Sequence, residues 1–396
     1  MSTPTKNRVD AVLVGCEWFH SVDGALEKML DAIACAQRSV RLEVYIFGKG
    51  PIGERFRTSL VEARGRGVAV SVMVDSLGSY DLPVDYFEPL KKAGGEFRWF
   101  NPLRVKRIGF RDHRKILVVD DLVAFVGGFN IAEAYCGDGV NRGWHDTSVQ
   151  LSTEFAVELG RIFDGMFRLA SQKPQPWVRF RKNANQRVIS TAEGQIITSG
   201  PNWRGFKMQQ VLCSAVQKAR CVQIISAYFL PPRQVRRALV LAAKRGARVT
   251  LILAAKTDVP MAQSAARRLY TGLLKAGVQI FEYQPQILHS KLFLFDDAVF
   301  VGSANLDKRS LHINYEVLVR LDAARITQQA RLFFEKALDL SQEITLEQWR
   351  KSRSFWTRLR EQWAWFLLAQ VDPYLAYRQF TWLRGEGLSE VRKKQS

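Results

Sequence analysis

The chain has 396 residues, and 47% of them are hydrophobic, so it can bury a large core and exceeds the usual size of one domain. Lysine and arginine total 58 against 38 aspartate and glutamate, a formal net charge of +20, which predicts an anionic partner: nucleic acid or an acidic membrane surface. No stretch approaches the roughly 20 apolar residues that span a bilayer, so we expect a soluble or peripheral protein. The five cysteines show no ligand spacing, which disfavours a disulfide framework and a structural zinc site.

Helical and strand patterns alternate along the first part of the chain. We expect helices near residues 23–33, 56–63 and 90–94, and strands near 11–14, 40–47, 68–74 and 97–100. This alternation is typical of an α/β fold with a largely parallel sheet that is covered on both faces.

The same order of elements recurs after a linker that is rich in proline and polar residues. We expect helices near residues 211–219 and 235–243, and strands near 222–228 and 249–253. Gly94 and Gly277 are 183 residues apart, whereas His113 and His289 are 176 apart, so the first half carries about seven extra residues before its histidine. The chain is therefore an internal repeat, and we expect two related lobes.

A second kind of repetition carries the chemistry. Each half contains a histidine, a lysine two residues later, an aspartate five residues after the lysine, and then a glycine and an asparagine: His113, Lys115, Asp120, Gly127 and Asn130, and His289, Lys291, Asp296, Gly302 and Asn305. Histidine and lysine two apart on a strand project from the same face, toward the same ligand. Two such pairs predict one shared site for phosphoryl transfer through a covalent phosphohistidine.

The doubled motif resembles that of the phospholipase D superfamily, and its flanks resemble bacterial cardiolipin synthases of the type without amino-terminal membrane spans. The flanks are Gly127-Gly128-Phe129-Asn130-Ile131, Trp144-His145-Asp146, Gly302-Ser303-Ala304-Asn305-Leu306-Asp307 and Asn314-Tyr315-Glu316. The resemblance implies an α/β fold of two pseudo-twofold-related α-β-α lobes with mixed, largely parallel sheets, plus a C-terminal helical tail. We expect a first lobe at 1–170, a linker and the start of the second lobe at 171–200, a second lobe at 201–342, and a basic, Trp-rich tail at 343–396.

The resemblance also implies roles for the motif residues. It makes His113 the nucleophile and His289 the general acid and base. It assigns the non-bridging phosphate oxygens to Lys115, Lys291, Asn130 and Asn305. It places a histidine-orienting carboxylate downstream of each histidine, which here points to Asp146 and Glu316. Asp120 and Asp296 are expected to fix lysine and backbone geometry. No metal or other cofactor is expected, because lysine and histidine do the charge work.

Three further expectations lie outside the motifs. The insertion from Leu103 to Asp112 contains Arg104, Lys106, Arg107 and Arg111, which form either a clamp for an anionic head group or a solvated basic loop. The tail places Phe355, Trp356, Leu359, Trp363, Phe366 and Leu367 on one helical face, which suits either a bilayer interface or packing on its own domain. Val371-Asp372-Pro373 is expected to break that helix. His20, His145 and His312 are interpreted as structural.

The function we expect is the joining of two phosphatidylglycerols into cardiolipin with release of glycerol, by a peripheral protein on an anionic phospholipid membrane, at the cytoplasmic face of the cell membrane. A hydrolytic phospholipase D, transfer to another alcohol, and a nucleic-acid phosphodiesterase remain open alternatives, as does a non-catalytic membrane scaffold. Nucleic acid is the less expected partner because of the Trp-rich tail. The sequence does not indicate the oligomeric state.

Overall fold

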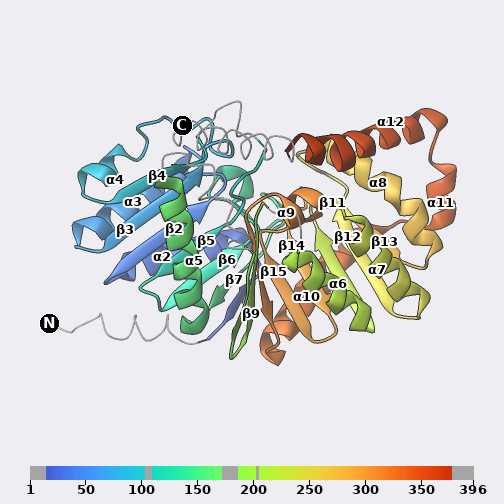
Figure 1. Cartoon of the computed structure of the whole chain (residues 1–396), viewed down its shortest axis with the longest axis horizontal. Helices are drawn as coiled ribbons and strands as arrows, with labels where there is room; N and C mark the ends of the chain where they lie inside the picture. Colours follow the sequence, from blue (N-terminus) through green and yellow to red (C-terminus); the bar gives the residue numbers. More distant parts are fainter. Residues whose placement is uncertain (1–14, 103–108, 172–185, 202–204, 377–396) are drawn as a thin grey trace, which may run out of the picture.

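Two lobes, each built on one mixed β-sheet, lie side by side in the computed structural model (Figure 1). The structure describes residues 15–102, 109–171, 186–201 and 205–376. The strand expected at 11–14, the basic residues Arg104, Lys106 and Arg107, and most of the linker lie outside these residues. The division of the chain into the four segments above therefore stays a prediction.

The first lobe contains a seven-stranded sheet in the order β1-β7-β6-β5-β2-β3-β4. Its strands are β1 (Glu17–Phe19), β2 (Ser39–Val44), β3 (Ala69–Asp75), β4 (Glu96–Phe100), β5 (Ile116–Val119), β6 (Val123–Gly127) and β7 (Ser148–Leu151). Its helices are α2 (Val22–Cys35), α3 (Pro51–Gly65), α4 (Glu88–Lys92) and α5 (Thr153–Ser171), with a short 3-10 turn, η2 (Glu133–Tyr135). Apolar side chains of α2 and α3 pack on one face of the sheet, and those of α5 on the other.

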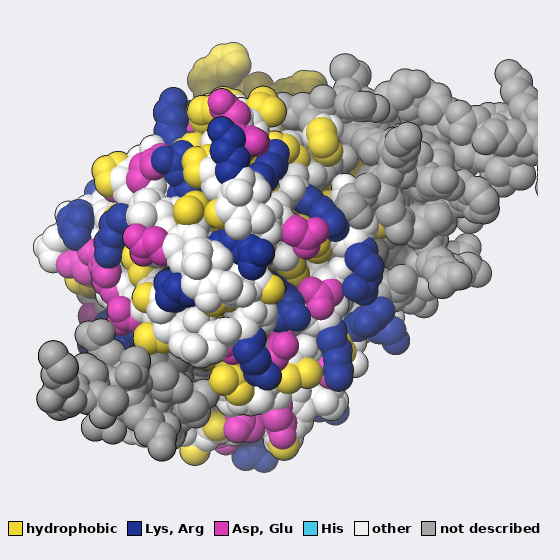
Figure 2. Space-filling view, turned by 90° about the vertical axis from the view of Figure 1, so that its left-hand side faces the viewer, with side chains coloured by type: hydrophobic (Ala, Val, Ile, Leu, Met, Phe, Trp, Pro, Cys, Tyr) yellow, Lys and Arg dark blue, Asp and Glu magenta, His cyan; other side chains and the backbone are white. Residues whose placement is uncertain are grey.

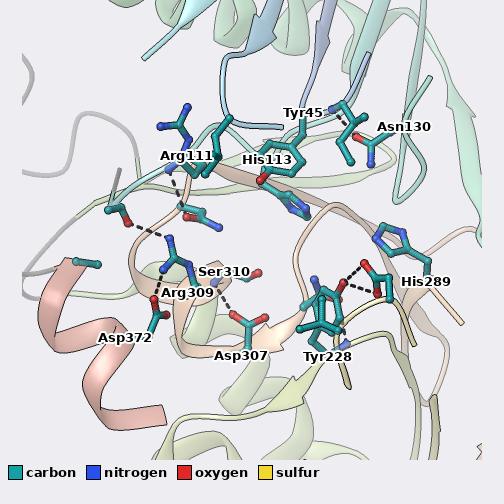
Figure 3. Close-up of a pocket in the computed structure, with 18 of the residues that line it drawn as sticks. Tyr45, Arg111, His113, Asn130, Tyr228, His289, Asp307, Arg309, Ser310 and Asp372 are labelled. Atoms are coloured by element: carbon teal, nitrogen blue, oxygen red, sulfur yellow. Dashed lines mark hydrogen bonds and ion pairs between the residues drawn. The ribbon is translucent and has the colours of Figure 1, made fainter. Parts of the chain in front are cut away.

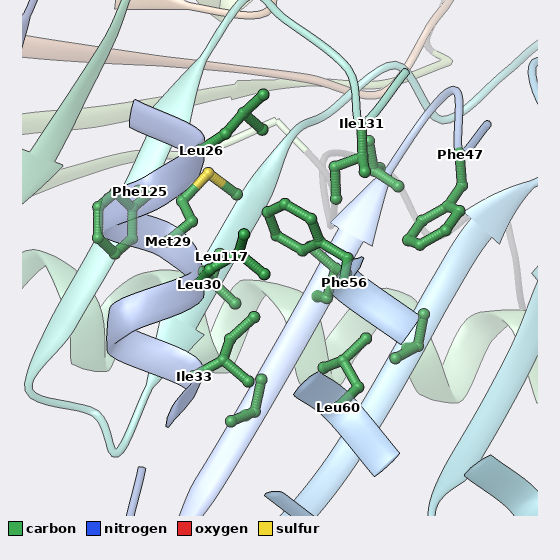
Figure 4. Close-up of a cluster of buried hydrophobic side chains, with 14 of the residues drawn as sticks. Leu26, Met29, Leu30, Ile33, Phe47, Phe56, Leu60, Leu117, Phe125 and Ile131 are labelled. Atoms are coloured by element: carbon green, nitrogen blue, oxygen red, sulfur yellow. The ribbon is translucent and has the colours of Figure 1, made fainter. Parts of the chain in front are cut away.

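The sequence of α2 shows why this packing forms. Ser21 caps the helix by accepting a hydrogen bond from the Gly24 amide at 3.2 Å. Leu26, Met29 and Ile33 recur at helical spacing and are buried against the sheet, in contact with the cluster that contains Phe125 (Figure 4). Burying each such side chain stabilises the fold by roughly 1.5–3 kcal/mol, so the helix is held by its apolar stripe.

The second lobe contains a nine-stranded sheet in the order β18-β13-β12-β10-β14-β15-β17-β9-β8. Its strands are β8 (Val188–Thr191), β9 (Gly194–Ser199), β10 (Cys221–Ser226), β12 (Arg248–Ala254), β13 (Gln279–Tyr283), β14 (Lys291–Phe295), β15 (Ala298–Gly302), β17 (Glu316–Leu321) and β18 (Ser341–Glu343). Its helices are α6 (Lys207–Lys218), α7 (Arg233–Lys244), α8 (Pro260–Lys275), α9 (Lys308–His312), α10 (Ala324–Asp339) and α11 (Leu346–Lys351). A small parallel pair, β11 (Phe229–Leu230) and β16 (Leu306–Asp307), lies apart from the sheet.

Both sheets are mixed, as expected, but the expectation that they are largely parallel is wrong. In the first sheet β2 pairs in parallel with β3, and β3 with β4, while the other four pairs are antiparallel. Each motif strand continues into an antiparallel hairpin, β5–β6 and β14–β15. The buried apolar runs reveal that these strands are covered on both faces but not their direction. Positive φ angles at Asp120, Asp121 and Asp296 form the tight turns of these hairpins. The adjacent aspartates at each turn are the sequence pattern that could have predicted a hairpin here.

One hydrophobic cluster joins the lobes. It includes Ile116 and Val126 of the first sheet, Leu292 and Val301 of the second, and Phe333 of α10. The two motif hairpins are therefore central to a shared core, which fixes the two copies of the motif relative to each other.

The C-terminal tail forms α12 (Phe355–Phe366), which packs along α8 on the outside of the second lobe (Figure 1). The expected break at Pro373 is wrong: a π-helical turn, η4 (Leu367–Val371), precedes the proline, and the chain stays helical to Ala376. Such a turn accommodates the amide that proline lacks. Within the described ranges, none of the helices combines the length and the apolar character that crossing a membrane requires.

Candidate active site

The two motif histidines line one cavity between the lobes. The cavity has a volume of about 590 Å³, and both His113 and His289 reach it (Figure 3). Side chains from both lobes and from the end of the tail complete its wall: Tyr45, Asn130, Tyr135, Tyr228, Asp258, Asn305, Asp307, Arg309, Asp372 and Leu375. The structure thus brings the two copies of the motif to a single site.

His113 is held by a carboxylate from the other lobe. Its Nδ1 lies 3.0 Å from Oε2 of Glu316, a fully buried side chain that also accepts a hydrogen bond from the Ser303 hydroxyl. The backbone amide of His113 donates to the carbonyl of Tyr315 at 2.9 Å. These contacts fix the ring and leave its Nε2 for the cavity.

His289 has the mirrored arrangement. Its Nδ1 lies 2.6 Å from Oδ2 of Asp146, which is also fully buried. Its backbone amide donates to the carbonyl of His145 at 2.8 Å, and the His145 amide donates to the carbonyl of Ile287, also at 2.8 Å. His145 is structural, as expected, because its backbone joins the lobes and its ring lies against Tyr283.

The pairing of histidines with carboxylates runs across the lobes. Asp146 and Glu316 were expected to orient the motif histidines, and each contacts one. However, each contacts the histidine of the opposite lobe rather than the one that precedes it along the chain. The site is therefore complete only when both lobes are folded and docked.

The two motif lysines lie beside the histidines. Lys115 donates to the carbonyl of His113 at 2.6 Å, and Lys291 donates to the carbonyl of His289. The ammonium of Lys291 also lies 3.1 Å from Nε2 of His289. Both lysines are buried, so their charge acts at short range in a low-dielectric site.

The motif asparagines and aspartates have clear structural partners. Oδ1 of Asn130 accepts from the Ile46 amide at 2.9 Å, and Nδ2 of Asn130 donates to the Tyr135 hydroxyl at 2.7 Å. Asn305 accepts from the Tyr228 amide at 3.4 Å. Both amides line the cavity, where Nδ2 is the atom that could reach a phosphate oxygen. Its role in binding phosphate stays a prediction.

The motif aspartates lie at the far ends of their strands and hold backbone. Asp120 accepts from the amides of Gln37, Arg38 and Ser39 at 2.7–2.8 Å. Asp296 accepts from the amides of Arg220 and Cys221 in the second lobe. Both aspartates therefore join the motif hairpin to the neighbouring strand of their own lobe, away from the cavity.

The residues predicted for the head group or the membrane fall into three groups. Arg111 does not form part of an exposed clamp: it is buried and donates to Asp75 at 2.7 Å, at the cavity wall. Arg104, Lys106 and Arg107 lie outside the described residues. Trp356 and Trp363 are 75% and 58% exposed on α12, not in the cavity.

Sequence analysis missed several residues that line the cavity. Tyr45 contacts the His113 ring and Tyr228 the His289 ring, with centroids 4.9 and 6.4 Å apart. The Tyr228 hydroxyl donates to Asp258 at 2.7 Å. The 183-residue offset between Tyr45 and Tyr228 was a signal for the tyrosines. No local pattern marks Asp258, which lies in the segment between β12 and α8 and reaches the cavity from there.

Another contact that the sequence did not reveal joins the tail to the site. Arg309 donates to Asp372 at 2.6 Å and to the carbonyl of Gly109 at 3.1 Å (Figure 3). Leu375 and Ala376 also line the cavity. The tail therefore forms part of the cavity wall.

Burial changes the acid–base properties of the site. It lowers the pKa of His289 to about 4, with a further contribution from Lys291, and it lowers the pKa of His113 well below its usual value. Burial also lowers the pKa of Lys115 to about 7 and that of Lys291 to about 8. Burial raises the pKa of Glu316 to about 8, which Lys115 opposes. Neutral histidines can attack phosphorus, and a phosphate anion between the lysines would favour their charged forms.

Within the part of the chain that the structure describes, no group of three or more histidine, cysteine, aspartate or glutamate side chains is arranged to hold a metal ion. The arrangement that is present can perform nucleophilic attack, proton transfer and charge stabilisation with side chains alone.

Comparison with known proteins identifies the family. A model described as "Cardiolipin synthase, PLD-like domain" matches residues 29–166 and 212–338. Cardiolipin synthase 1 of Bacillus cereus is 30% identical over 352 residues, which cover 86% of this chain and 69% of the relative. Cardiolipin synthase 1 of Staphylococcus epidermidis is 32% identical over 336 residues, which cover 82% of this chain and 68% of the relative.

A solved structure agrees on the fold. Phosphatidylserine synthase of Haemophilus influenzae superposes with a TM-score of 0.71 at 13% identity, covering 94% of this chain and 99% of that one. At this identity the likeness concerns the fold alone, and it extends over both lobes. With two copies of the motif at one cavity and relatives that match most of its length, the chain belongs to the phospholipase D-like cardiolipin synthase family.

Proposed function

We propose that this protein is a cardiolipin synthase, which transfers a phosphatidyl group from one phosphatidylglycerol to another and releases glycerol. Two histidine–carboxylate pairs that face one cavity, each formed across the lobes, carry this proposal. The cavity supplies a nucleophile, a proton carrier and two buried lysines, which is what exchange at a phosphodiester requires.

In the first half of the reaction, Nε2 of His113 attacks the phosphorus of one phosphatidylglycerol. The bond from phosphorus to the glycerol oxygen breaks, and His289 gives that oxygen a proton, so glycerol leaves and a phosphatidyl-histidine remains. Burial lowers the pKa of His289 to about 4, and the negative charges of Asp146 and of the bound phosphate act against this by favouring the protonated imidazole. Lys115 and Lys291 stabilise charge on the phosphate oxygens.

In the second half, a hydroxyl of another phosphatidylglycerol gives its proton to His289. Its oxygen bonds to phosphorus, the bond to His113 breaks, and cardiolipin forms. The same histidine thus acts as acid and then as base, as microscopic reversibility demands. Water in place of the second lipid would give phosphatidic acid, so exclusion of water decides between a synthase and a hydrolase.

The tail supports action on a membrane surface. The predicted face of α12 is exposed rather than packed on the domain: Phe355, Trp356, Leu359, Trp363, Phe366 and Leu367 are 38–75% exposed. Such an aromatic face suits the bilayer interface. The chain then runs from α12 to Leu375 and Ala376, which line the cavity. A lipid layer that holds α12 would thus lie beside the mouth of the site. Peripheral attachment at the cytoplasmic face of the membrane is part of this proposal.

The test is product analysis with labelled phosphatidylglycerol vesicles and a chelator, comparing the intact protein with His113→Ala and His289→Ala. His20→Ala is a matched control, because His20 is exposed and does not line the cavity. We expect cardiolipin and glycerol from the intact protein and the control only. Phosphatidic acid as the sole lipid product would mean that the protein is a hydrolase and not a synthase. Cleavage of oligonucleotides but not of lipid would mean that it is a nuclease.

A further inference from the structure

A second cavity lies outside the active site, in a groove formed by α7, α8 and α12. Its volume is about 550 Å³. Four arginines line it: Arg233, Arg236, Arg237 and Arg268. Apolar side chains form the rest of its wall: Val240, Leu269, Leu273 and Trp365. We call it the arginine groove.

Among the described residues, no acidic side chain neutralises the positive charge of the arginine groove. Helices α7 and α8 contain no aspartate or glutamate, and the one acidic residue of α12, Glu361, is buried and paired with Arg353. In the described part of the chain, none of the four arginines has a carboxylate within ion-pair distance, and Nε of Arg268 donates to the side-chain oxygen Oε1 of Gln362 at 2.5 Å. Burial together with Arg233 and Arg268 lowers the pKa of Arg236, so the arginines repel one another.

The opposite end of the molecule shows how unusual this is. On the outer face of the first lobe, Lys and Arg side chains are interspersed with Asp and Glu (Figure 2). In this lobe Arg55 pairs with Glu27 at 2.7 Å, and Arg57 with Glu54 at 2.5 Å. Four arginines gathered in one concave site, without a carboxylate partner among the described residues, favour the binding of an anion.

We propose that the arginine groove binds the phosphate head group of an anionic glycerophospholipid, as a site separate from the active site. Guanidinium groups match phosphate oxygens in geometry and charge. The apolar wall, Leu269, Leu273 and Trp365, gives the acyl or glycerol part of the same molecule a surface to lie against. This inference stands on the groove alone and does not depend on the catalytic proposal.

The place of the groove favours a lipid in a bilayer. Trp365 lines the groove, while its neighbours Trp363 and Phe366 are 58% and 45% exposed on α12. Helix α12 therefore exposes aromatic side chains that suit a bilayer interface and also forms part of the groove wall. A lipid bound there would hold α12 on the membrane, and with it the segment that ends at the active site.

Two variants test the groove with vesicles of phosphatidylcholine and phosphatidylserine at physiological ionic strength. The first removes three charges, Arg236→Gln, Arg237→Gln and Arg268→Gln, and its control removes three charges from exposed positions in α2, α4 and α10: Lys28→Gln, Lys92→Gln and Arg325→Gln. We expect about 100-fold weaker binding for the groove variant, from roughly fivefold per charge for three charges at a membrane surface, and less than about fivefold for the control. Equal losses would overturn the site in favour of diffuse attraction.

The second variant fills the groove without changing charge. Gly272 lines it, and a Cβ at this position meets nothing within 4 Å, so Gly272→Leu adds bulk at the groove and suits the helix. Gly165→Leu is the control, because Gly165 is also helical and open but lies in α5 of the first lobe. We expect vesicle binding to fall about tenfold only for Gly272→Leu, with both variants as stable as the intact protein. Equal binding by the two variants would contradict an occupied groove.

Soluble probes separate a lipid from other phosphates. Inorganic phosphate should raise the unfolding temperature of the intact protein only weakly. Any binding of a single-stranded oligonucleotide should be the same for the intact protein and for the groove variant. If the binding of phosphate or of the oligonucleotide is lost in the groove variant while vesicle binding is kept, the groove is not a lipid site. Vesicle flotation and thermal unfolding, run on the same samples, provide both readings.

Discussion

The two copies of the motif present the same histidine and lysine but lie in different surroundings. Around the first motif the structure buries five charged side chains: Glu43, Asp75, Arg111, Asp112 and Arg114. The corresponding positions around the second motif, by distance from the histidine or by place in the strand, hold Ile225, Ala254, Ile287, Leu288 and Ser290. One half of the site is therefore supported by buried ions, and the other by apolar packing and backbone hydrogen bonds.

This difference shows that the reacting groups can be pseudo-symmetric although the buried residues that surround them are not. Buried ion pairs cost desolvation, and replacing them with apolar residues is often neutral or stabilising. Their attested benefit is that they specify one arrangement. Arg111 and Asp75 fix the segment before His113, whose amide bonds the other lobe, so we infer that they set the position of the first motif at the lobe interface.

The largest expected effect concerns the chemistry of the two halves. Both His113→Ala and His289→Ala should lower the turnover of phosphatidylglycerol by about 10⁴-fold or more, because a nucleophile and an acid have no substitute in the cavity. They should differ in what accumulates: labelled phosphatidyl-enzyme in His289→Ala, and none in His113→Ala. Acid-quenched labelling measures this. Label on His289 in the His113→Ala protein would reverse the assignment.

The next effect concerns stability. Asp75→Asn leaves Arg111 buried without its carboxylate, and we expect about 3–5 kcal/mol loss in the free energy of unfolding. The double change Asp75→Ala with Arg111→Ile copies the second lobe and should recover most of that loss. Denaturant unfolding measures both. A double variant as unstable as Asp75→Asn would show that the buried charge stabilises the lobe itself.

A smaller effect should come from the crosswise carboxylates. Glu316→Gln removes the carboxylate that orients His113, and Asp146→Asn does the same for His289. We expect each to lower kcat about 100-fold with little change in KM, because an orienting partner acts through the histidine. Glu282→Gln is the control, since Glu282 is buried in the second lobe without lining the cavity. A change in KM alone would mean that the carboxylates affect binding instead.

That crosswise pairing also marks the limit of prediction from the sequence. The helices and strands follow from periodicity within about 15 residues, and the repeat revealed two lobes and one shared site. The contacts of His113 with Glu316 and of His289 with Asp146 span 203 and 143 residues, and nothing local distinguishes them from pairing within each lobe. The Arg111–Asp75 pair was missed for the same reason: a run of basic residues looks solvated until its carboxylate is brought beside it.

The next prediction concerns pH, which should change the apparent KM about tenfold through the two motif lysines. Lys115, with a pKa of about 7, loses its proton before Lys291, with a pKa of about 8, so raising the pH from 7 to 9 removes positive charge first from the first motif. The apparent KM for phosphatidylglycerol should therefore rise about tenfold over this interval. Lys115→Arg stays charged and should shift the rise to higher pH. An unchanged profile in Lys115→Arg would exclude Lys115 as the titrating group.

The smallest expected effect concerns the wall beside each histidine. The Tyr228 hydroxyl donates to Asp258, whereas the Tyr45 hydroxyl makes no hydrogen bond within the described residues. Asp258 can also accept from a glycerol hydroxyl, so the second lobe offers the more polar place for the incoming alcohol. Asp258→Asn should lower cardiolipin formation about threefold to tenfold, the worth of one hydrogen bond, with hydrolysis to phosphatidic acid unchanged. Asp81→Asn, an exposed change of the same charge, is the control. Equal losses of both products would place Asp258 in support of His289 rather than at the acceptor.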